Sequence, residues 1–246
     1  MSRSHRRPLV LSLAGLTAAA VFALLIPASA RSASCTSFQE FAGPANSISA
    51  QASQGVQASI QMNTPSYATG SCVPKFVVGT AHLLLNGGPQ PSALEIGWIH
   101  GQSDGYHTFY EIEVNGGFSL SCGSICTLVT GCLGNGVTNN YSVNLSGTTY
   151  QLRYNCTGYV NAATASVAQM GGDTTGIALI ESERDGAFNK DQRFTGTLYK
   201  SASGTWAGFS AGGGLSCWYD SDAGYRFRYN GPNDWSSTTA AGSGAC

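Results

Sequence analysis

The chain reads Phe76-Val-Val-Gly-Thr-Ala-His-Leu-Leu-Leu85, then Ala93-Leu-Glu-Ile-Gly-Trp-Ile99, then Tyr106-His-Thr-Phe-Tyr-Glu-Ile-Glu-Val114. β-Branched, aromatic and other apolar residues dominate these three runs. Asn86-Gly-Gly and Ser103-Asp-Gly, which lie between them, are turn sequences. No apolar period of 3.6 residues is sustained over the length of a helix. This stretch therefore predicts consecutive antiparallel strands.

The same pattern of short strands continues on both sides of this stretch. Further strands are expected at 57–62, 149–154, 165–169, 176–183, 193–199, 205–210, 216–219 and 225–229. Ten or more short strands at close spacing indicate two antiparallel sheets packed face to face. We therefore predict an all-β fold, a disulfide-bonded two-sheet β-sandwich over residues 55–246, in preference to a β-barrel or a propeller.

The N-terminal part of the chain has the features of an export signal. Three arginines precede an apolar run from Leu9 to Ile26, and Ala28-Ser-Ala30 is a small-residue cleavage site. We predict a signal peptide at 1–30, in preference to a membrane anchor, and a linker or strap at 31–54. The expected product is a secreted, extracellular protein that has no membrane contact after cleavage.

Composition excludes one class of partner and indicates an oxidising compartment. Without residues 1–30, nine basic and thirteen acidic residues remain, a formal net charge of −4. Nucleic-acid binding needs a basic stripe, and the sequence has none. The eight cysteines all follow the predicted signal, so four disulfides of unassigned pairing are expected. The four histidines form no close ligand pair, so no metal site and no cofactor are predicted.

Glutamates placed within apolar strands are the candidate catalytic groups. Glu95 stands between Leu94 and Ile96, whereas Glu181 and Glu183 are two positions apart and share one face of their strand. Two carboxyl groups on one sheet face can hydrolyse a bond when one donates a proton and the other activates water. Glu111 is expected to be an ordinary solvated residue.

Aromatic residues are numerous in and near the predicted strands. Most are expected to pack in the core, but an aromatic ring beside a groove can bind a sugar or a peptide side chain. Trp98 and Tyr110 are the candidate substrate-binding residues. The expected partner is therefore a peptide or protein substrate, or alternatively a polysaccharide, bound by a monomer.

Four ordered segments resemble the neprosin domain. They are the strand that begins at Gly55 and leads to a proline, Leu94-Glu-Ile-Gly-Trp98, Tyr106-His-Thr-Phe-Tyr110 and Ser121-Cys-Gly-Ser-Ile-Cys126. The resemblance covers about residues 55–132, and the cysteine spacing is one residue shorter than the pattern of the family. The fungal-type glutamic peptidases are similar in layout, with glutamine in place of Glu95.

The resemblance implies a concanavalin-like β-sandwich and an acid-active, metal-free glutamic endopeptidase. Glu95 would be the first catalytic residue. The segment Ile180-Glu-Ser-Glu-Arg184 resembles the strand that carries the second, and either Glu181 or Glu183 matches, depending on the alignment. The alternative function is a non-catalytic carbohydrate-binding or other binding module on the same fold.

Overall fold

A computed structural model describes most of the chain as β-strands. It describes residues 39–46, 53–67, 76–85, 92–115, 117–119, 132–185, 187–188, 192–209, 216–220 and 226–238. The predicted signal peptide lies outside these residues. The described part contains no helix, and hence none long and apolar enough to cross a membrane.

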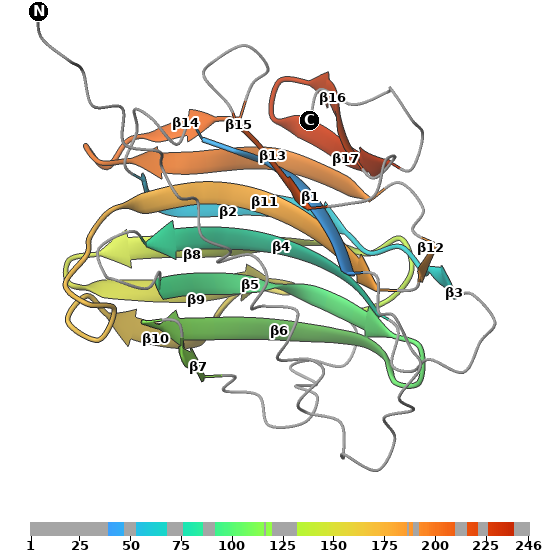
Figure 1. Cartoon of the computed structure of the whole chain (residues 1–246), viewed down its shortest axis with the longest axis horizontal. Coiled ribbons are helices and arrows are strands. Elements are labelled where there is room, and N and C mark those ends of the chain that lie inside the picture. The colour runs from blue at the N-terminus through green and yellow to red at the C-terminus, as the bar shows by residue number, and fades with distance from the viewer. Residues whose placement is uncertain are drawn as a thin grey trace, which may run out of the picture.

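Seventeen strands are described (Figure 1). They are β1 (Gln39–Ala45), β2 (Ser53–Gln61), β3 (Ser66–Tyr67), β4 (Phe76–Leu85), β5 (Ser92–Gly101), β6 (Gly105–Val114), β7 (Gly117–Ser119), β8 (Thr138–Ser146), β9 (Thr149–Asn155), β10 (Tyr159–Ser166), β11 (Gly176–Asp185), β12 (Ala187–Phe188), β13 (Arg193–Ser201), β14 (Trp206–Gly208), β15 (Ser216–Asp220), β16 (Arg226–Gly231) and β17 (Asp234–Thr238).

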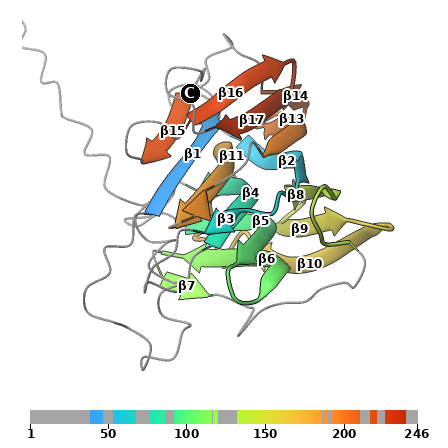
Figure 2. The ribbon, with the colours of Figure 1, turned by 90° about the vertical axis from the view of Figure 1, so that its right-hand side faces the viewer.

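All the strands except β3 and β12, which pair with each other, form two antiparallel layers, which confirms the predicted sandwich (Figure 2). One layer, here called the site sheet, has the order β7-β6-β5-β4-β11-β1-β15. The other, the back sheet, has the order β10-β9-β8-β2-β13-β17-β16, with β14 also beside β13. A single paired position connects the layers, Gly176 opposite Ser53, which are the first residues of β11 and β2, and the sheet does not close into a barrel.

The hydrophobic core fills the space between the two layers. Side chains alternate across a strand, so every second residue of each strand points inward. The core residues of the site sheet include Leu94, Ile96 and Trp98, all completely buried. Those of the back sheet include Val56 and Val143. The residues that alternate with these core residues along each strand point to the outer face of the layer.

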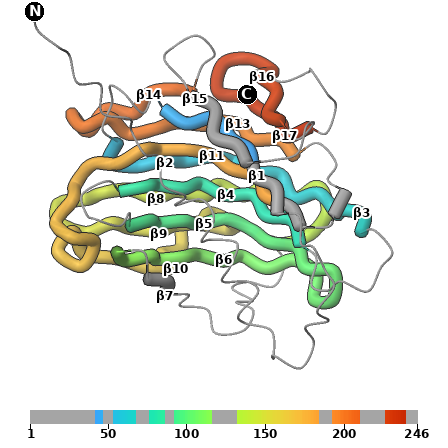
Figure 3. The backbone as a smooth tube through the Cα atoms, in the orientation of Figure 1, coloured from blue at the N-terminus to red at the C-terminus, as the bar shows by residue number. Residues whose placement is uncertain are grey.

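Segments far apart in the sequence meet at the centre of the site sheet. β4, β5 and β6 are neighbours along the chain and form two hairpins. β11 lies between β4 and β1, as the tube in Figure 3 shows. β1 lies within residues 31–54, the segment for which the sequence predicted a linker or strap.

One disulfide is described, between Cys132 and Cys156, with a Cα–Cα separation of 5.6 Å. It joins the chain before β8 to the end of β9, so it closes the hairpin of these two strands. The other predicted pairings involve residues or side chains outside the described part of the chain.

Candidate functional site

The outer face of the site sheet, here called the site face, carries a band of ionisable side chains. Register places His82 of β4 opposite Glu95 of β5, and Glu95 opposite Glu111 of β6. On the other side of β4, Glu181 of β11 is opposite Thr80, which is two positions before His82. Residues directly opposite each other in a sheet share one face, and so do residues two positions apart on one strand. His82, Glu95, Glu111 and Glu181 therefore all lie on the same face.

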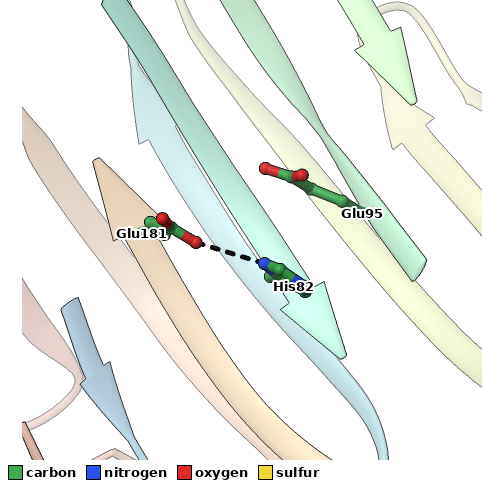
Figure 4. Close-up of side chains that lie close together, drawn as sticks. All are labelled: His82, Glu95 and Glu181. Carbon is green, nitrogen blue, oxygen red and sulfur yellow. Dashed lines mark hydrogen bonds and ion pairs between the residues drawn. The ribbon is translucent and has the colours of Figure 1, made fainter. Parts of the chain in front are cut away.

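Glu181 and Glu95 approach one another across β4 (Figure 4). Their carboxyl groups point toward each other, and His82 lies beside the gap between them. One oxygen or nitrogen atom from each of His82, Glu95 and Glu181 lies within 4.8 Å of the other two. Two hydrogen bonds of about 2.7 Å each span up to about 5.4 Å, so one water molecule can contact both carboxyl groups.

His82 makes a direct contact with one of the two carboxyl groups. Its Nδ1 lies 3.1 Å from Oε2 of Glu181, and both side chains are buried. At this distance Nδ1–H donates a hydrogen bond to the carboxylate. An ion pair forms when the imidazole is protonated, and burial shields it from solvent screening.

Burial raises the pKa of the two facing carboxyl groups on β5 and β6. Burial is the largest cause for Glu95, and the charge of His82 opposes it only in part, so its pKa rises from 4.5 to about 7. Burial and the neighbouring charge of Glu95 raise the pKa of Glu111 to about 8. Burial also raises the pKa of Glu113. These carboxyl groups therefore stay protonated at a pH at which an exposed glutamate is ionised.

The pKa of His82 is raised as well, but by a hydrogen bond and by neighbouring charges rather than by burial. Burial lowers the pKa of its imidazole, but the hydrogen bond to Glu181 and the charges of Glu95, Glu181 and Glu111 outweigh burial. The net effect raises the pKa of His82 from 6.5 to about 9. The imidazole is therefore positively charged at neutral pH, in the middle of the carboxyl band.

Two small apolar clusters lie on either side of the band. Ala45, Leu84, Ala93, Ile177 and Leu179 form one cluster, and Phe76, Val78, Ile99 and Phe109 form the other. Both occupy the site face, because register alternates them with the core residues of β4 and β5. Apolar side chains thus flank the ionisable groups, and the resulting burial is the largest cause of the raised pKa values of Glu95 and Glu111.

The structure brings together some of the predicted site residues and not others. Glu95 and Glu181 come together, whereas Glu183 lies two positions further along β11, opposite Val78. Trp98 and Tyr110, the predicted substrate-binding residues, lie on the face of the site sheet opposite to the carboxyl groups. Trp98 is completely buried in the core, and Tyr110 is partly buried against the core. Trp98 is three positions from Glu95 and Tyr110 is one position from Glu111, and residues an odd number of positions apart on a strand point to opposite faces.

Two residues of the site were not predicted from the sequence. His82 lies within a run of apolar residues, and only the register of β4 shows that it meets Glu95. Glu111 was expected to be solvated, but it is only 3% exposed. This burial corrects the expectation. Glu111 lies directly opposite Glu95 on the site face, and the buried Phe109 is its neighbour on β6 on that face.

The residue types in this cluster also occur at metal sites. Among the described residues, His82, Glu95 and Glu181 are the one group whose atoms lie close enough to share an ion. A metal would take the lone pair of a ring nitrogen of His82. The 3.1 Å separation of Nδ1 and Oε2 of Glu181 fits a hydrogen bond and also fits two ligands of one ion, and sensitivity to chelators separates the two interpretations.

Comparison with known proteins supports the fold. No protein-family model matches the chain, and no curated protein matches it. Two solved structures of scytalido-glutamic peptidase do match, one with a peptide-based transition-state analogue (16% identity, TM-score 0.53) and one with a transition-state analogue inhibitor (18% identity, TM-score 0.54). Each match covers 83% of this chain and 100% of the solved chain.

At this level of identity the likeness establishes the fold alone. The predicted resemblance to the glutamic peptidases is thus confirmed for the architecture. The closer resemblance to neprosin stays a prediction.

Proposed function

We propose that this protein is a secreted glutamic-type endopeptidase that hydrolyses peptide bonds with Glu95, Glu181 and one water molecule. The observation that carries the proposal is the approach of two buried carboxyl groups across β4, within 4.8 Å of each other. Glu181 is favoured over Glu183 because it is the one whose carboxyl group lies within this distance of Glu95.

The chemistry requires one ionised and one protonated carboxyl group. Two carboxyl groups this close do not both ionise easily, because like charges repel. Glu95, whose pKa is raised to about 7 chiefly by burial, is suited to hold the proton. Glu181 would then act as the base.

In the proposed reaction, Glu181 takes a proton from water while the water oxygen bonds to the carbonyl carbon of the peptide. Glu95 gives its proton to the amide nitrogen as the carbon–nitrogen bond breaks. Transfer of the proton from Glu181 to Glu95 then restores the starting state.

The fold is consistent with a peptide substrate. The matching scytalido-glutamic peptidase was solved with a peptide-based analogue, on a sandwich of the same architecture. The apolar clusters on the site face lie on either side of the carboxyl groups, where side chains of a bound peptide would pack. The predicted signal peptide and the Cys132–Cys156 disulfide support an extracellular site of action.

The test compares two glutamates of one strand. Glu181→Gln and Glu183→Gln change neighbouring positions on the same face of β11, and both side chains are buried to a similar degree. Cleavage of a denatured, proline-containing protein is measured from pH 3 to pH 8, in the presence of pepstatin and of a chelator. We expect Glu181→Gln to lower kcat by about 10²- to 10⁴-fold, and Glu183→Gln to retain most of the activity.

The opposite ranking of the two variants would assign the second carboxyl group to Glu183. Loss of activity with the chelator would favour a metal-dependent reaction in the same cluster. No cleavage by folded wild-type protein at any pH would reject the peptidase and favour a binding module.

A further inference from the structure

The Nδ1–H of His82 is directed at Glu181, although carboxyl groups surround the imidazole. Glu95 faces it from β5, Glu111 and Glu113 from β6, and Glu181 from β11. β4 itself contributes no other ionisable side chain within its described residues. Of these four carboxyl groups, that of Glu181 accepts the hydrogen bond, at 3.1 Å.

We propose that His82 is a positioning residue, which holds the carboxylate of Glu181 in the orientation that faces Glu95 and leaves the proton of the pair on Glu95. This inference rests on the proposed function, because it explains which of the two carboxyl groups acts as the base. It adds a third residue, from a strand between the two that carry the carboxyl groups.

The first argument is geometric. The imidazole of His82 lies on β4 between the strands of Glu95 and Glu181 (Figure 4). A glutamate side chain has three rotatable bonds, so its carboxyl group needs an external contact to keep one orientation. The hydrogen bond from Nδ1 supplies that contact, and it comes from an imidazole that is itself buried.

The second argument concerns charge. One imidazolium balances one carboxylate, and the carboxylate in direct contact gains the most from it, because the attraction falls with distance. The remaining carboxyl groups are buried without such a contact to His82, so protonation is their favoured form. The raised pKa values of Glu95 and Glu111 agree with this distribution.

The experiment removes the two contributions of His82 in turn. His82→Leu removes both the hydrogen bond and the charge. His82→Asn keeps a neutral N–H donor on the atom that corresponds to Nδ1. His107→Asn is the control, because His107 lies on the same sheet face, is buried to the same degree and contacts Asp104 rather than a glutamate.

We expect His82→Leu to lower kcat by about 10- to 100-fold while KM changes little, because proton transfer depends on the orientation of the base. His82→Asn should recover part of kcat. The acidic limb of its pH–kcat profile should move to higher pH by about 1 unit or more, because the carboxylate of Glu181 has lost the positive charge beside it. His107→Asn should behave as wild type.

Equal loss of kcat in His82→Leu and His107→Asn, or an unchanged acidic limb in His82→Asn, would overturn the inference. Melting temperatures measured on the same samples separate these effects from loss of folding.

A second readout does not depend on activity. The imidazole signals are titrated by NMR in the full protein, and the signal of His82 is identified by its absence in His82→Asn. Glu181→Gln should lower the titration midpoint of His82, whereas Glu183→Gln should change it less. An unchanged midpoint in Glu181→Gln would overturn the pairing. If the wild type cleaves nothing but this midpoint shifts, the proposed function fails and the His82–Glu181 pair stands.

Discussion

The protonation of Glu95 is the residue-level property on which the proposed chemistry depends. Its carboxyl group is buried beside other carboxyl groups, and burial is the main reason that its pKa rises to about 7. An exposed glutamate has a pKa of about 4.3 and would be ionised throughout most of the range in which Glu95 stays protonated. Glu95 can therefore donate a proton up to near-neutral pH.

Glu95→Gln tests this role through the shape of the pH profile. In the wild type, activity should fall as pH rises through about 7, because Glu95 loses its proton. Glutamine has a similar shape and donates a hydrogen bond but cannot transfer a proton to the amide nitrogen. We expect the variant to lose about 10²- to 10⁴-fold in kcat/KM at acidic pH and to lose the alkaline limb near pH 7, as measured from pH 4 to pH 9. An alkaline limb unchanged in the variant would assign it to another group.

The sequence predicts individual residues of the site better than their partners. Glu95 could be selected, and Glu181 or Glu183 beside it, because a charged residue in an apolar strand is uncommon. His82 could not, because nothing local shows that its strand lies between theirs. Trp98 and Tyr110 show the converse limit. Adjacency in sequence placed them near the site, but alternation along the strand turns them to the opposite face.

At the scale of the strands, a glycine permits the close approach of β5 to β4. A Cβ built on Gly97 would collide with the backbone oxygen of Gly79 and would lie 2.8 Å from the Cα of Thr80. Gly97 is two positions from Glu95 and is on the same face. Its missing side chain therefore helps to set the position of Glu95 relative to His82.

Gly97→Ala should separate the two strands and reduce activity beyond its effect on stability. The backbone atoms that it meets cannot rotate away, so we expect a loss of about 1–3 kcal/mol in the free energy of unfolding, with a clear fall in kcat. Gly79→Ala is the matched control, because its Cβ would meet side-chain atoms of Gln192, Ile60 and Trp98 on the core face. Denaturant unfolding and kcat are measured for both. If Gly97→Ala and Gly79→Ala lose the same free energy of unfolding and have the same kcat, Gly97 does not position the site.

Most strands were predicted from alternation, and the failures have a physical cause. β8 (Thr138–Ser146) was not predicted, because its asparagines and serines favour turns. Its buried Tyr141, Val143 and Leu145 nevertheless alternate as in any strand. Residues 167–169, predicted as part of a strand, follow the end of β10 instead. A polar strand such as β8 depends on its neighbours in the sheet, β2 and β9, which local propensity does not include.

The buried ionisable groups should make the stability of the whole molecule depend on pH in an unusual direction. Glu95 and Glu111 have pKa values raised from 4.5 to about 7 and about 8, and His82 has a pKa raised from 6.5 to about 9. In each case the folded state binds more protons than the unfolded state. The free energy of unfolding must therefore decrease as pH rises from about 4.5 to about 9.

Thermal unfolding followed from pH 5 to pH 9 checks this expectation. We expect Tm to fall by more than about 10 °C, in contrast to proteins that are most stable near neutrality. Glu111→Gln keeps the shape of the side chain and removes one titrating group, so its Tm should fall less steeply with pH. A Tm that is constant or rises across this range would show that these groups are not protonated in the folded protein.

The architecture as a whole could be predicted, whereas the strand order could not. Many short alternating segments specify two packed sheets, and the structure has them. The insertion of β11 between β4 and β1 depends on contacts between residues about 100 positions apart. No local pattern encodes these contacts, so the meeting of Glu181 with His82 was beyond sequence reasoning.

β11 is synthesised after β4, β5 and β6, and this order has a consequence for how the protein is made. The hairpins β4–β5 and β5–β6 join neighbouring segments and can form early in synthesis, while Glu181 follows His82 by 99 positions. A nascent chain therefore carries Glu95 and His82 without their partner and cannot yet perform two-carboxyl chemistry. Until β11 docks, the edge of β4 presents unpaired backbone groups to any other unfinished chain. The same interval in synthesis thus delays assembly of the proposed two-carboxyl site and exposes the edge of β4 to aggregation.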